Sequence, residues 1–302
     1  MRWELPRLEW LARFDVLFAP NFVAPPTTTR RLVVTIHDLA FRLHPETAPM
    51  ATRRWLARLD RAVRQAAEIV APSEATRRDL LELYPLDADR VTVIHHGIDP
   101  DRFRPAPPEE VERIRRRHGI DGPYLLSLGG LEPRKNLPAL VRAWSPLAGD
   151  AALVVAGASV SWNPEGRTEL ERTLRGLPGP ARDRVTLTGY VGHRDKVALL
   201  TGARALAFPS LYEGFGFPLL EAMAVGTPVV TSDLSSMPEV AGDAAVLVDP
   251  RDEDAVAEGL RRVLSDEGLA ERLVAAGRDR VGRFDWERCA RAHVEVLHRA
   301  GR

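Results

Sequence analysis

Short apolar runs alternate with amphipathic stretches over most of the chain from residue 124 onward. Each run is four or five residues long, a length typical of strands that are buried on both faces of a parallel sheet. The alternation therefore predicts repeated βαβ units. The expected strands are 124–128, 152–156, 185–188, 205–208, 228–232 and 244–248.

Helices are expected between these strands, because apolar residues recur there at intervals of three and four positions. Pro218 and Gly226 bound one of them, since proline is favoured in the first helical turn and glycine directly after the last. The other expected helices are 137–144, 166–175 and 194–202.

The first hundred residues contain fewer strands and one long amphipathic helix, expected from about residue 50 to 67. Trp55, Leu59 and Val63 lie on one face of this helix, and its arginines fall largely elsewhere. We favour a helix that packs on a sheet and keeps its arginines in solvent; a helix lying on a membrane surface is the alternative. The expected strands are 15–18, 32–36, 68–71 and 91–94.

A proline-rich segment separates these two patterns. It contains Pro100, Pro105, Pro107 and Pro108, a density typical of a linker. The 302 residues also exceed the usual size of one domain, about 100–200 residues. We therefore predict a first domain at 1–105, a linker at 106–120 and a second domain at 121–283.

The charges balance at 42 Lys and Arg against 42 Asp and Glu. With no overall field to hold a polyanion, nucleic acid is not an expected partner. No stretch approaches the roughly 18 consecutive apolar residues of a membrane-spanning helix, and the one cysteine, Cys289, excludes an internal disulfide. The N-terminus shows no secretory signal pattern, so the cytoplasm is the expected compartment, with peripheral contact at the inner membrane face as the alternative.

The basic residues are strongly biased toward arginine. Lys135 and Lys196 are the two lysines beside 40 arginines, and asparagine occurs at three positions only. The run Arg134-Lys135-Asn136 thus joins one of the two lysines to one of the three asparagines, which directs attention to the loop that contains it.

That loop lies between a predicted strand and a predicted helix. Gly129 and Gly130 permit close approach of the backbone, and Arg134 and Lys135 add two positive charges beside a helix N-terminus, where an anion is favoured. This combination suits a diphosphate at the carboxyl end of a strand. The alternative is a solvated turn in which Asn136 caps the helix.

A second loop follows the predicted strand 205–208. In it Glu213 precedes a glycine-bearing turn, and Glu221 is expected in the first turn of the next helix. Ionised carboxylates accept hydrogen bonds from vicinal hydroxyls, and no His, Cys or Asp ligand set is nearby, so polyol recognition fits better than a metal. The alternative is one helix-dipole Glu and one loop Glu. The turn residues are Gly214, Phe215 and Gly216.

Three further strand ends carry residues that could contact a ligand. His37 follows the strand 32–36, where its imidazole could face a ligand while Asp38 orients the loop; a core or capping role is equally open. The residues 95–97, His-His-Gly, lack a third metal ligand and are interpreted as a loop lining the interdomain region. Tyr190 and Val191 follow Gly189 and could place backbone groups against a flat base.

Taken together, these segments resemble the retaining, nucleotide-sugar-dependent glycosyltransferases of the GT-B fold, glycosyltransferase group 1 or family 4, which include many bacterial mannosyl- and glucosyltransferases. The resemblance runs from about residue 10 to 300, with its segments in family order. They are Glu213-x7-Glu221 within LYEGFGFPLLEAMAVGTPVV, LSLGGLEPRKN, VTLTGYV, VTIHDLAF, VAPSEATRRDL and VIHHGID.

The resemblance implies an α/β fold of two Rossmann-like domains facing a cleft, the first one truncated. Residues 284–302 would form the terminal helix that packs back toward the first domain. The family's first domain starts with a strand and a glycine-rich loop, which the sequence from Met1 does not show. We therefore expect an exposed sheet edge and a fragment, a misassigned start or a short form whose gap a partner covers.

The resemblance also implies a role for each site residue. Arg134 and Lys135 would neutralise the donor diphosphate, and Glu221 would accept hydrogen bonds from the ribose hydroxyls. Glu213 would hold the donor sugar near its 3- and 4-hydroxyls, and the turn 189–191 would contact the base.

His37 would sit against the donor sugar from the opposite domain, near the 6-hydroxyl. The reaction implied is transfer of a hexose, of mannose or glucose type, from a UDP- or GDP-sugar to an acceptor hydroxyl with retention. The acceptor would be a glycan, a lipid-linked sugar or a small molecule, as in polysaccharide biosynthesis. The family mechanism is drawn as front-face attack without a protein nucleophile, and no cofactor or metal is expected.

Two other functions remain open at this point. A non-catalytic nucleotide-sugar-binding fragment or subunit would keep the second domain but lack the acceptor-side wall. A sugar phosphorylase is disfavoured, because Lys196 falls on a helix pattern and Lys135 is already assigned, which leaves no lysine for pyridoxal phosphate.

Overall fold

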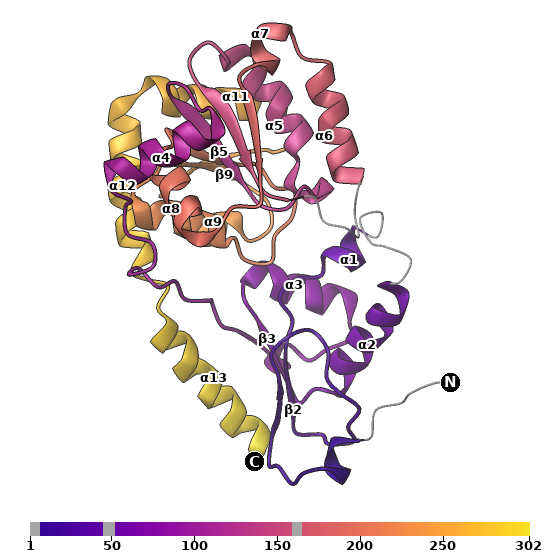
Figure 1. Cartoon of the computed structure of the whole chain (residues 1–302). Helices are drawn as coiled ribbons and strands as arrows, with labels where there is room; N and C mark the ends of the chain where they lie inside the picture. The colour runs from indigo at the N-terminus through magenta and orange to yellow at the C-terminus, as the bar shows by residue number, and fades with distance from the viewer. Residues whose placement is uncertain (1–6, 45–51, 159–164) are drawn as a thin grey trace. The chain divides into compact units, whose positions relative to one another are not determined.

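The computed structural model describes residues 7–44, 52–158 and 165–302. The chain forms two compact units (Figure 1). The first unit comprises Met1–Gly97 and Phe284–Arg302, and the second comprises Ile98–Arg283. Each unit has its own parallel sheet and its own core, and each is described by itself.

The first unit contains a four-stranded parallel sheet in the order β1-β2-β3-β4. Strand β2 is buried along its whole length, as its uninterrupted apolar run predicts. All four predicted strands are present, with ends that shift by one or two residues. Their bounds are β1 Leu17–Ala19, β2 Leu32–Thr35, β3 Glu68–Ala71 and β4 Val91–Val93.

Helices cover both faces of this sheet. On one face, the apolar side chains of α2 and α3 pack into a core with β2 and β3; on the other, Cys289, Val296 and Ala300 of α13 pack against Val33 and Val70. Leu59 and Val63 of α2 are fully buried, which confirms the interpretation that this helix packs on a sheet. The helices are α1 Ala40–Leu43, α2 Thr52–Gln65, α3 Glu74–Leu83 and α13 Trp286–Gly301.

The second unit contains a six-stranded parallel sheet in the order β10-β9-β8-β5-β6-β7. The chain first winds outward from β5 through β6 to β7, then returns to β8 and winds the opposite way. The central neighbours β5 and β8 therefore flank the topological switch point of a doubly wound sheet. The strands are β5 Tyr124–Leu128, β6 Ala152–Ala156, β7 Val185–Gly189, β8 Ala205–Phe208, β9 Val229–Ser232 and β10 Val246–Val248.

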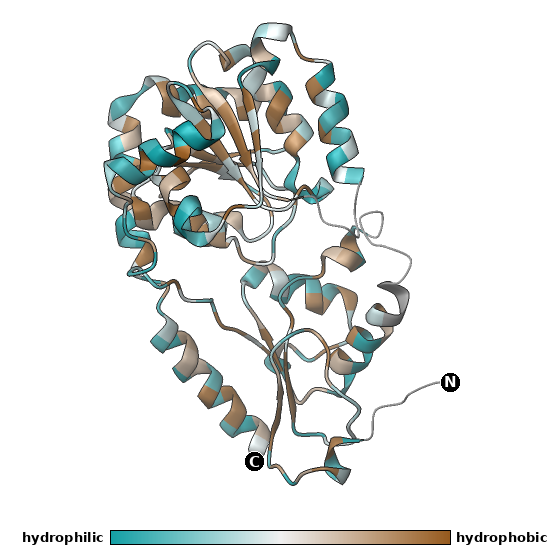
Figure 2. Ribbon diagram, in the orientation of Figure 1, coloured by the Kyte–Doolittle hydropathy of each residue, from teal (hydrophilic) through white to brown (hydrophobic). Residues whose placement is uncertain are grey.

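The helices of the second unit form a layer on each face of the sheet, as Figure 1 shows. Helices α5, α6 and α11 cover one face, and α4, α8 and α9 cover the other, with α12 packed on α9. Figure 2 shows the strands as the most hydrophobic part of this unit. The helices are α4 Pro108–His118, α5 Leu137–Trp144, α6 Glu165–Arg175, α7 Gly179–Arg182, α8 His193–Gly202, α9 Phe217–Val225, α10 Met237–Ala241, α11 Glu253–Ser265 and α12 Glu267–Val281.

Two predicted boundaries differ from the structure. The first unit ends at Gly97, not at residue 105. Most of the segment 106–120, expected to be a linker, is the helix α4, which packs on α8. Pro108 opens this helix and Gly119 closes it with a left-handed φ of 62°, so the prolines mark a helix start, where a missing N–H costs nothing. In the part of the chain that the structure describes, no helix is long and apolar enough to span a bilayer.

Candidate functional site

The two loops singled out in the sequence lie side by side in the second unit. One follows β5 and the other follows β8, and these strands are hydrogen-bonded neighbours. The amide of Leu211 donates to the carbonyl oxygen of Arg134 at 2.8 Å and ties the loops together. The switch point thus brings residues about 80 positions apart onto one edge, where doubly wound sheets bind their ligands.

Glu213 receives both basic residues of the first loop. Arg134 Nη1 lies 2.7 Å from Glu213 Oε2, and the Lys135 ammonium pairs with Glu213 Oε1. Lys135 and Glu213 are each only 9% exposed, so the alternative of a solvated basic pair is wrong. Arg134 also pairs with Glu132 at 2.9 Å, a carboxylate that the sequence analysis did not single out.

These four side chains form a charge-balanced cluster in which Lys135 and Glu213 are buried and Arg134 and Glu132 are partly buried. Burial alone would raise the pKa of Glu213, but Lys135 and Arg134 outweigh it and hold the pKa below its ordinary value. Glu213 is therefore ionised at neutral pH. The Lys135 ammonium also lies over the ring of Phe208, with Nζ 4.7 Å from the ring centroid. Such a cluster is stable only with all partners present, because a buried charge without its partner is costly.

Backbone contacts hold both loops in place. Gly129 has a φ of 134°, which residues with a side chain rarely adopt. A Cβ on Gly157 would overlap the carbonyl oxygen of Gly129. Ser236 Oγ donates to the carbonyls of Glu213 at 2.9 Å and Phe215 at 2.7 Å. Ser235 Oγ also donates to the Glu213 carbonyl, at 2.6 Å. The sequence analysis did not single out either serine.

Glu221 lies deeper in its helix than expected. Helix α9 begins at Phe217, so Glu221 is its fifth residue and falls in the second turn, not the first. Its carboxylate Oε1 lies 2.6 Å from the ammonium of Lys196 on α8. Gly216 precedes the helix with a left-handed φ of 114°, which explains a glycine there, and Gly214 is part of the same turn.

Two further predictions concern Asn136 and the turn that follows β7. Asn136 stands at the N-cap position of α5, but its side chain donates to the Pro250 carbonyl at 2.6 Å and makes no cap bond. The capping role of Asn136, which belonged to the alternative of a solvated turn, is therefore wrong. Gly189, with a φ of 70°, turns the chain at the end of β7 toward Tyr190, which is 83% exposed, and Val191. Their contact with a base stays a prediction.

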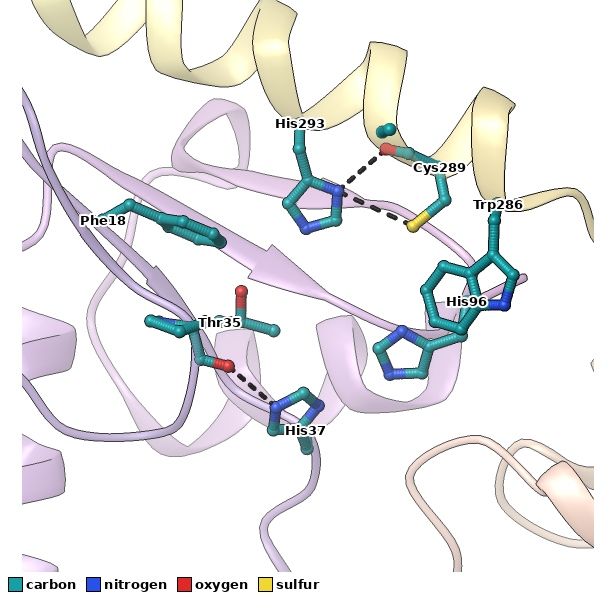
Figure 3. A pocket seen from close by; sticks show the side chains of 9 residues that line it. Phe18, Thr35, His37, His96, Trp286, Cys289 and His293 are labelled. Atoms are coloured by element: carbon teal, nitrogen blue, oxygen red, sulfur yellow. Dashed lines mark hydrogen bonds between the residues drawn. The ribbon is translucent and has the colours of Figure 1, made fainter. Parts of the chain in front are cut away.

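His37 lies in the first unit, on a pocket of about 340 Å³ (Figure 3). Residues at the carboxyl ends of β1, β2 and β4 form one wall, and α13 forms the other. The lining is almost entirely apolar apart from the edges of three imidazoles. It consists of Phe18, Pro20, Thr35, His37, His96, Trp286, Cys289, Ala290 and His293.

The imidazoles of this pocket are oriented by their neighbours. The ring nitrogen Nε2 of His37 donates to the Pro20 carbonyl at 2.9 Å, since a carbonyl oxygen can only accept. The ring of His96 stacks 5.4 Å from that of His37. Burial, and then the nearby His37 and His293, lower the pKa of His96 to about 4, so His96 is neutral at neutral pH.

The His-His-Gly segment also docks the terminal helix within the first unit. A Cβ on Gly97 would overlap the backbone of Trp286, and the ring of His95 lies 5.6 Å from that of Phe284. A glycine is therefore required where α13 begins. Across the described ranges, no group of three or more His, Cys, Asp or Glu side chains could hold a metal ion; the predicted absence of a metal stays a prediction.

Comparison with known families matches both units. Residues 110–280 match the glycosyl transferases group 1 family, and residues 1–102 match glycosyltransferase family 4. The chain belongs to the glycosyl transferases group 1 family. The resemblance stated from the sequence motifs is thus confirmed.

Relatives of this group 1 glycosyltransferase include two bacterial enzymes. The O-antigen chain mannosyltransferase B of Escherichia coli is 30% identical over 278 residues, which are 91% of this chain and 71% of the relative. The D-inositol 3-phosphate glycosyltransferase of Xylanimonas cellulosilytica is 33% identical over 282 residues, which are 89% of this chain and 66% of that enzyme. The chain thus spans about two thirds of these relatives.

A solved structure with the same fold is Anabaena Alr3699/HepE in complex with UDP and glucose. The two structures superpose with a TM-score of 0.78 at 20% identity, and the match covers 94% of this chain and 78% of the Anabaena chain. Together with the two parallel sheets, this similarity confirms the predicted α/β GT-B fold class for the group 1 glycosyltransferase.

Proposed function

We propose that this glycosyltransferase moves a hexose of mannose or glucose type from a UDP- or GDP-sugar to an acceptor hydroxyl. Transfer proceeds with retention of the anomeric configuration and without a metal ion. The observation that carries the proposal is the convergence of Arg134, Lys135 and Glu213 at the switch point of the second unit, with Glu221 on the adjoining helix α9.

The charges of this cluster suit a diphosphate donor. Lys135 uses one of its three N–H donors for Glu213, which leaves the other two for phosphate oxygens. The N-terminal end of α9 adds a positive partial charge. Preorganised positive groups of this kind stabilise the negative charge that develops on a departing diphosphate, so no protein nucleophile is needed.

Glu213 and Glu221 then take different parts of the donor. Glu213 is held at the base of the cluster by Arg134 and Lys135, next to the expected position of the diphosphate and the hexose. Glu221 lies one helical turn past the start of α9, where its carboxylate can accept hydrogen bonds from the ribose. His37, whose Nε2 is engaged by the Pro20 carbonyl, would contact a hydroxyl of the donor sugar.

The names of similar proteins support the choice of donor and sugar. One relative is a mannosyltransferase, and a protein with the same fold was solved with UDP and glucose. The acceptor, a glycan, a lipid-linked sugar or a small molecule, remains a proposal with the rest of the reaction.

The test is binding followed by turnover. Calorimetry with UDP, GDP, UDP-glucose and GDP-mannose should show binding of one nucleotide family, and Glu221→Ala should weaken it by about tenfold without unfolding. Release of nucleoside diphosphate should then be followed with an acceptor panel, with and without EDTA, and the product anomer assigned by NMR. Binding to neither family, inversion, or loss of rate with EDTA would contradict the corresponding part of the proposal.

The same experiment separates the alternative of a non-catalytic binding subunit. Such a protein would bind nucleotide sugar with the same dependence on Glu221 but release no nucleoside diphosphate with any acceptor. Turnover with any acceptor rejects the alternative.

A further inference from the structure

The two lysines of the chain both pair with the glutamates of the Glu213-x7-Glu221 motif. Lys135 pairs with Glu213, and Lys196 Nζ lies 2.6 Å from Glu221 Oε1. Everywhere else the chain uses arginine as its cation, at 40 positions. Each lysine of the chain thus pairs with one carboxylate of this motif. The proposed diphosphate site accounts for Lys135 but gives no role to Lys196.

Lys196 lies between the two parts of the predicted nucleoside site. Helix α8 starts at His193, two residues after Val191, with Gly192 as its N-cap, and Lys196 is its fourth residue. Helices α8 and α9 pack against each other, which brings the ammonium of Lys196 to Glu221. The lysine therefore stands beside the carboxylate assigned to the ribose and one helical turn from the turn assigned to the base.

An aromatic contact fixes the position of the ammonium. Lys196 Nζ lies 5.1 Å from the centroid of the Phe103 ring, a distance within the range of a cation–π interaction. Phe103 is only 9% exposed, and its ring packs edge-on against His193 at 5.0 Å. The lysine is thus held on one side by an aromatic ring and on the other by Glu221.

The segment that carries Phe103 is itself tied along α8. A ring nitrogen of His193 lies 2.8 Å from the Arg102 carbonyl, and the amide of Ala106 donates to Thr201 Oγ1 at 2.9 Å. Because the chain is attached to α8 on both sides of Phe103, the ring cannot move away without breaking these hydrogen bonds. The ammonium is thereby preorganised instead of sampling the many rotamers of a free lysine.

The chemistry of the pair favours lysine over arginine. A carboxylate that accepts two vicinal hydroxyls must present both oxygens in a fixed plane. A compact ammonium on Oε1 restrains that oxygen and leaves its second lone pair, and all of Oε2, for the ligand. A guanidinium prefers to bind a carboxylate through two parallel bonds, which would occupy both oxygens.

We infer that Lys196 is a positioning residue that orients Glu221 toward the 2′- and 3′-hydroxyls of the donor ribose. It thereby sets the preference of the site for ribonucleotides over deoxyribonucleotides. This inference rests on the proposed function, because it needs Glu221 to be the ribose acceptor.

The test compares affinities for a ribonucleoside diphosphate and its 2′-deoxy analogue, UDP with dUDP and GDP with dGDP, by calorimetry on the full chain. The wild-type protein should prefer the ribonucleotide by about tenfold. Lys196→Met should reduce this preference to about threefold or less by weakening the ribonucleotide while leaving the deoxy analogue nearly unchanged. Lys196→Arg should restore only part of the preference.

A matched control lies on the same helix. Arg194→Gln removes one positive charge two residues away, where Arg194 pairs with Glu110 and is 76% exposed; it should keep the wild-type preference. Circular dichroism on each variant excludes unfolding as the cause of any loss.

Failure of the inference differs from failure of the proposed function. If Glu221→Gln abolishes the preference but Lys196→Met keeps it, the inference is overturned and the ribose assignment stands. If the wild-type protein binds both nucleotides equally, or binds neither, the ribose assignment itself is wrong and the inference falls with it.

Discussion

The two units present opposite kinds of chemistry at the carboxyl ends of their strands. In the second unit, Arg134, Lys135 and Glu213 form a buried ionic cluster with Glu132. In the first unit, the pocket that holds His37 is apolar, and His96 in its wall is neutral. The comparison teaches that one unit is organised around fixed charges, at the site proposed for a diphosphate, and the other around an apolar pocket in which the His96 imidazole is neutral.

The largest effect is expected from the ionic cluster. Glu213→Gln removes the carboxylate that two buried cations share and should lower stability by about 3–5 kcal/mol, because the cations lose their partner. Calorimetric melting measures the loss. Glu253→Gln is the control, since its pair with Arg142 is 42–48% exposed and should cost about 1 kcal/mol or less. Equal losses for both variants would contradict a special role of the cluster.

A smaller loss is expected where α13 docks on the first unit. Gly97→Ala places a Cβ against the Trp286 backbone and should cost about 1–3 kcal/mol through overpacking. Hydrogen exchange should show faster opening of 286–301 in particular. Gly149→Ala, whose Cβ would meet nothing within 4 Å, is the matched control. Unchanged protection of α13 in Gly97→Ala would show that the helix end can shift at no cost.

The neutral imidazole of His96 predicts an acid dependence of stability that belongs to the first unit. The pKa of His96 is lowered from 6.5 to about 4, so between these values the unfolded chain binds a proton that the folded chain does not. The stability that the neutral His96 contributes is therefore fully present above pH 6.5 and is lost as the pH falls toward 4. After discounting for partial exposure, the His96 contribution to this loss is about 1–2 kcal/mol.

His96→Gln should flatten the dependence of stability on pH between 6.5 and 4, measured by denaturant unfolding at several pH values. His298→Gln, at an exposed position on α13, should leave the wild-type slope. A slope that His96→Gln does not change would assign the acid sensitivity to other groups.

Most strands were predictable because they are buried and largely apolar, as for Tyr124–Leu128 and Ala152–Ala156. Strands β1 and β7 are only partly buried, and their alternation with helices along the chain indicated them instead. Helix α4 was mistaken for a linker, since the prolines that open it also mark linkers. The motif Glu213-x7-Glu221 and the run Arg134-Lys135 indicated the two loops of the charged cluster. These loops meet because they follow adjacent parallel strands, whose carboxyl ends lie at one edge of the sheet.

Other parts of the site depend on packing that the local sequence does not encode. Lys196 lies on a helical pattern like any surface lysine, and only the packing of α8 on α9 brings it to Glu221. The pocket of the first unit joins residues near the start of the chain, such as Phe18, to His293 on the last helix. No pattern within either segment indicates that contact.

Hydrogen exchange with and without UDP or GDP tests most directly whether the charged unit is the nucleotide site. The account predicts that saturating nucleotide protects amides of 129–136 and 209–216 and the start of α9, and leaves the pocket segments of the first unit, 18–20 and 286–293, unchanged. Protection confined to the first unit, or none in the two switch-point loops, would contradict it.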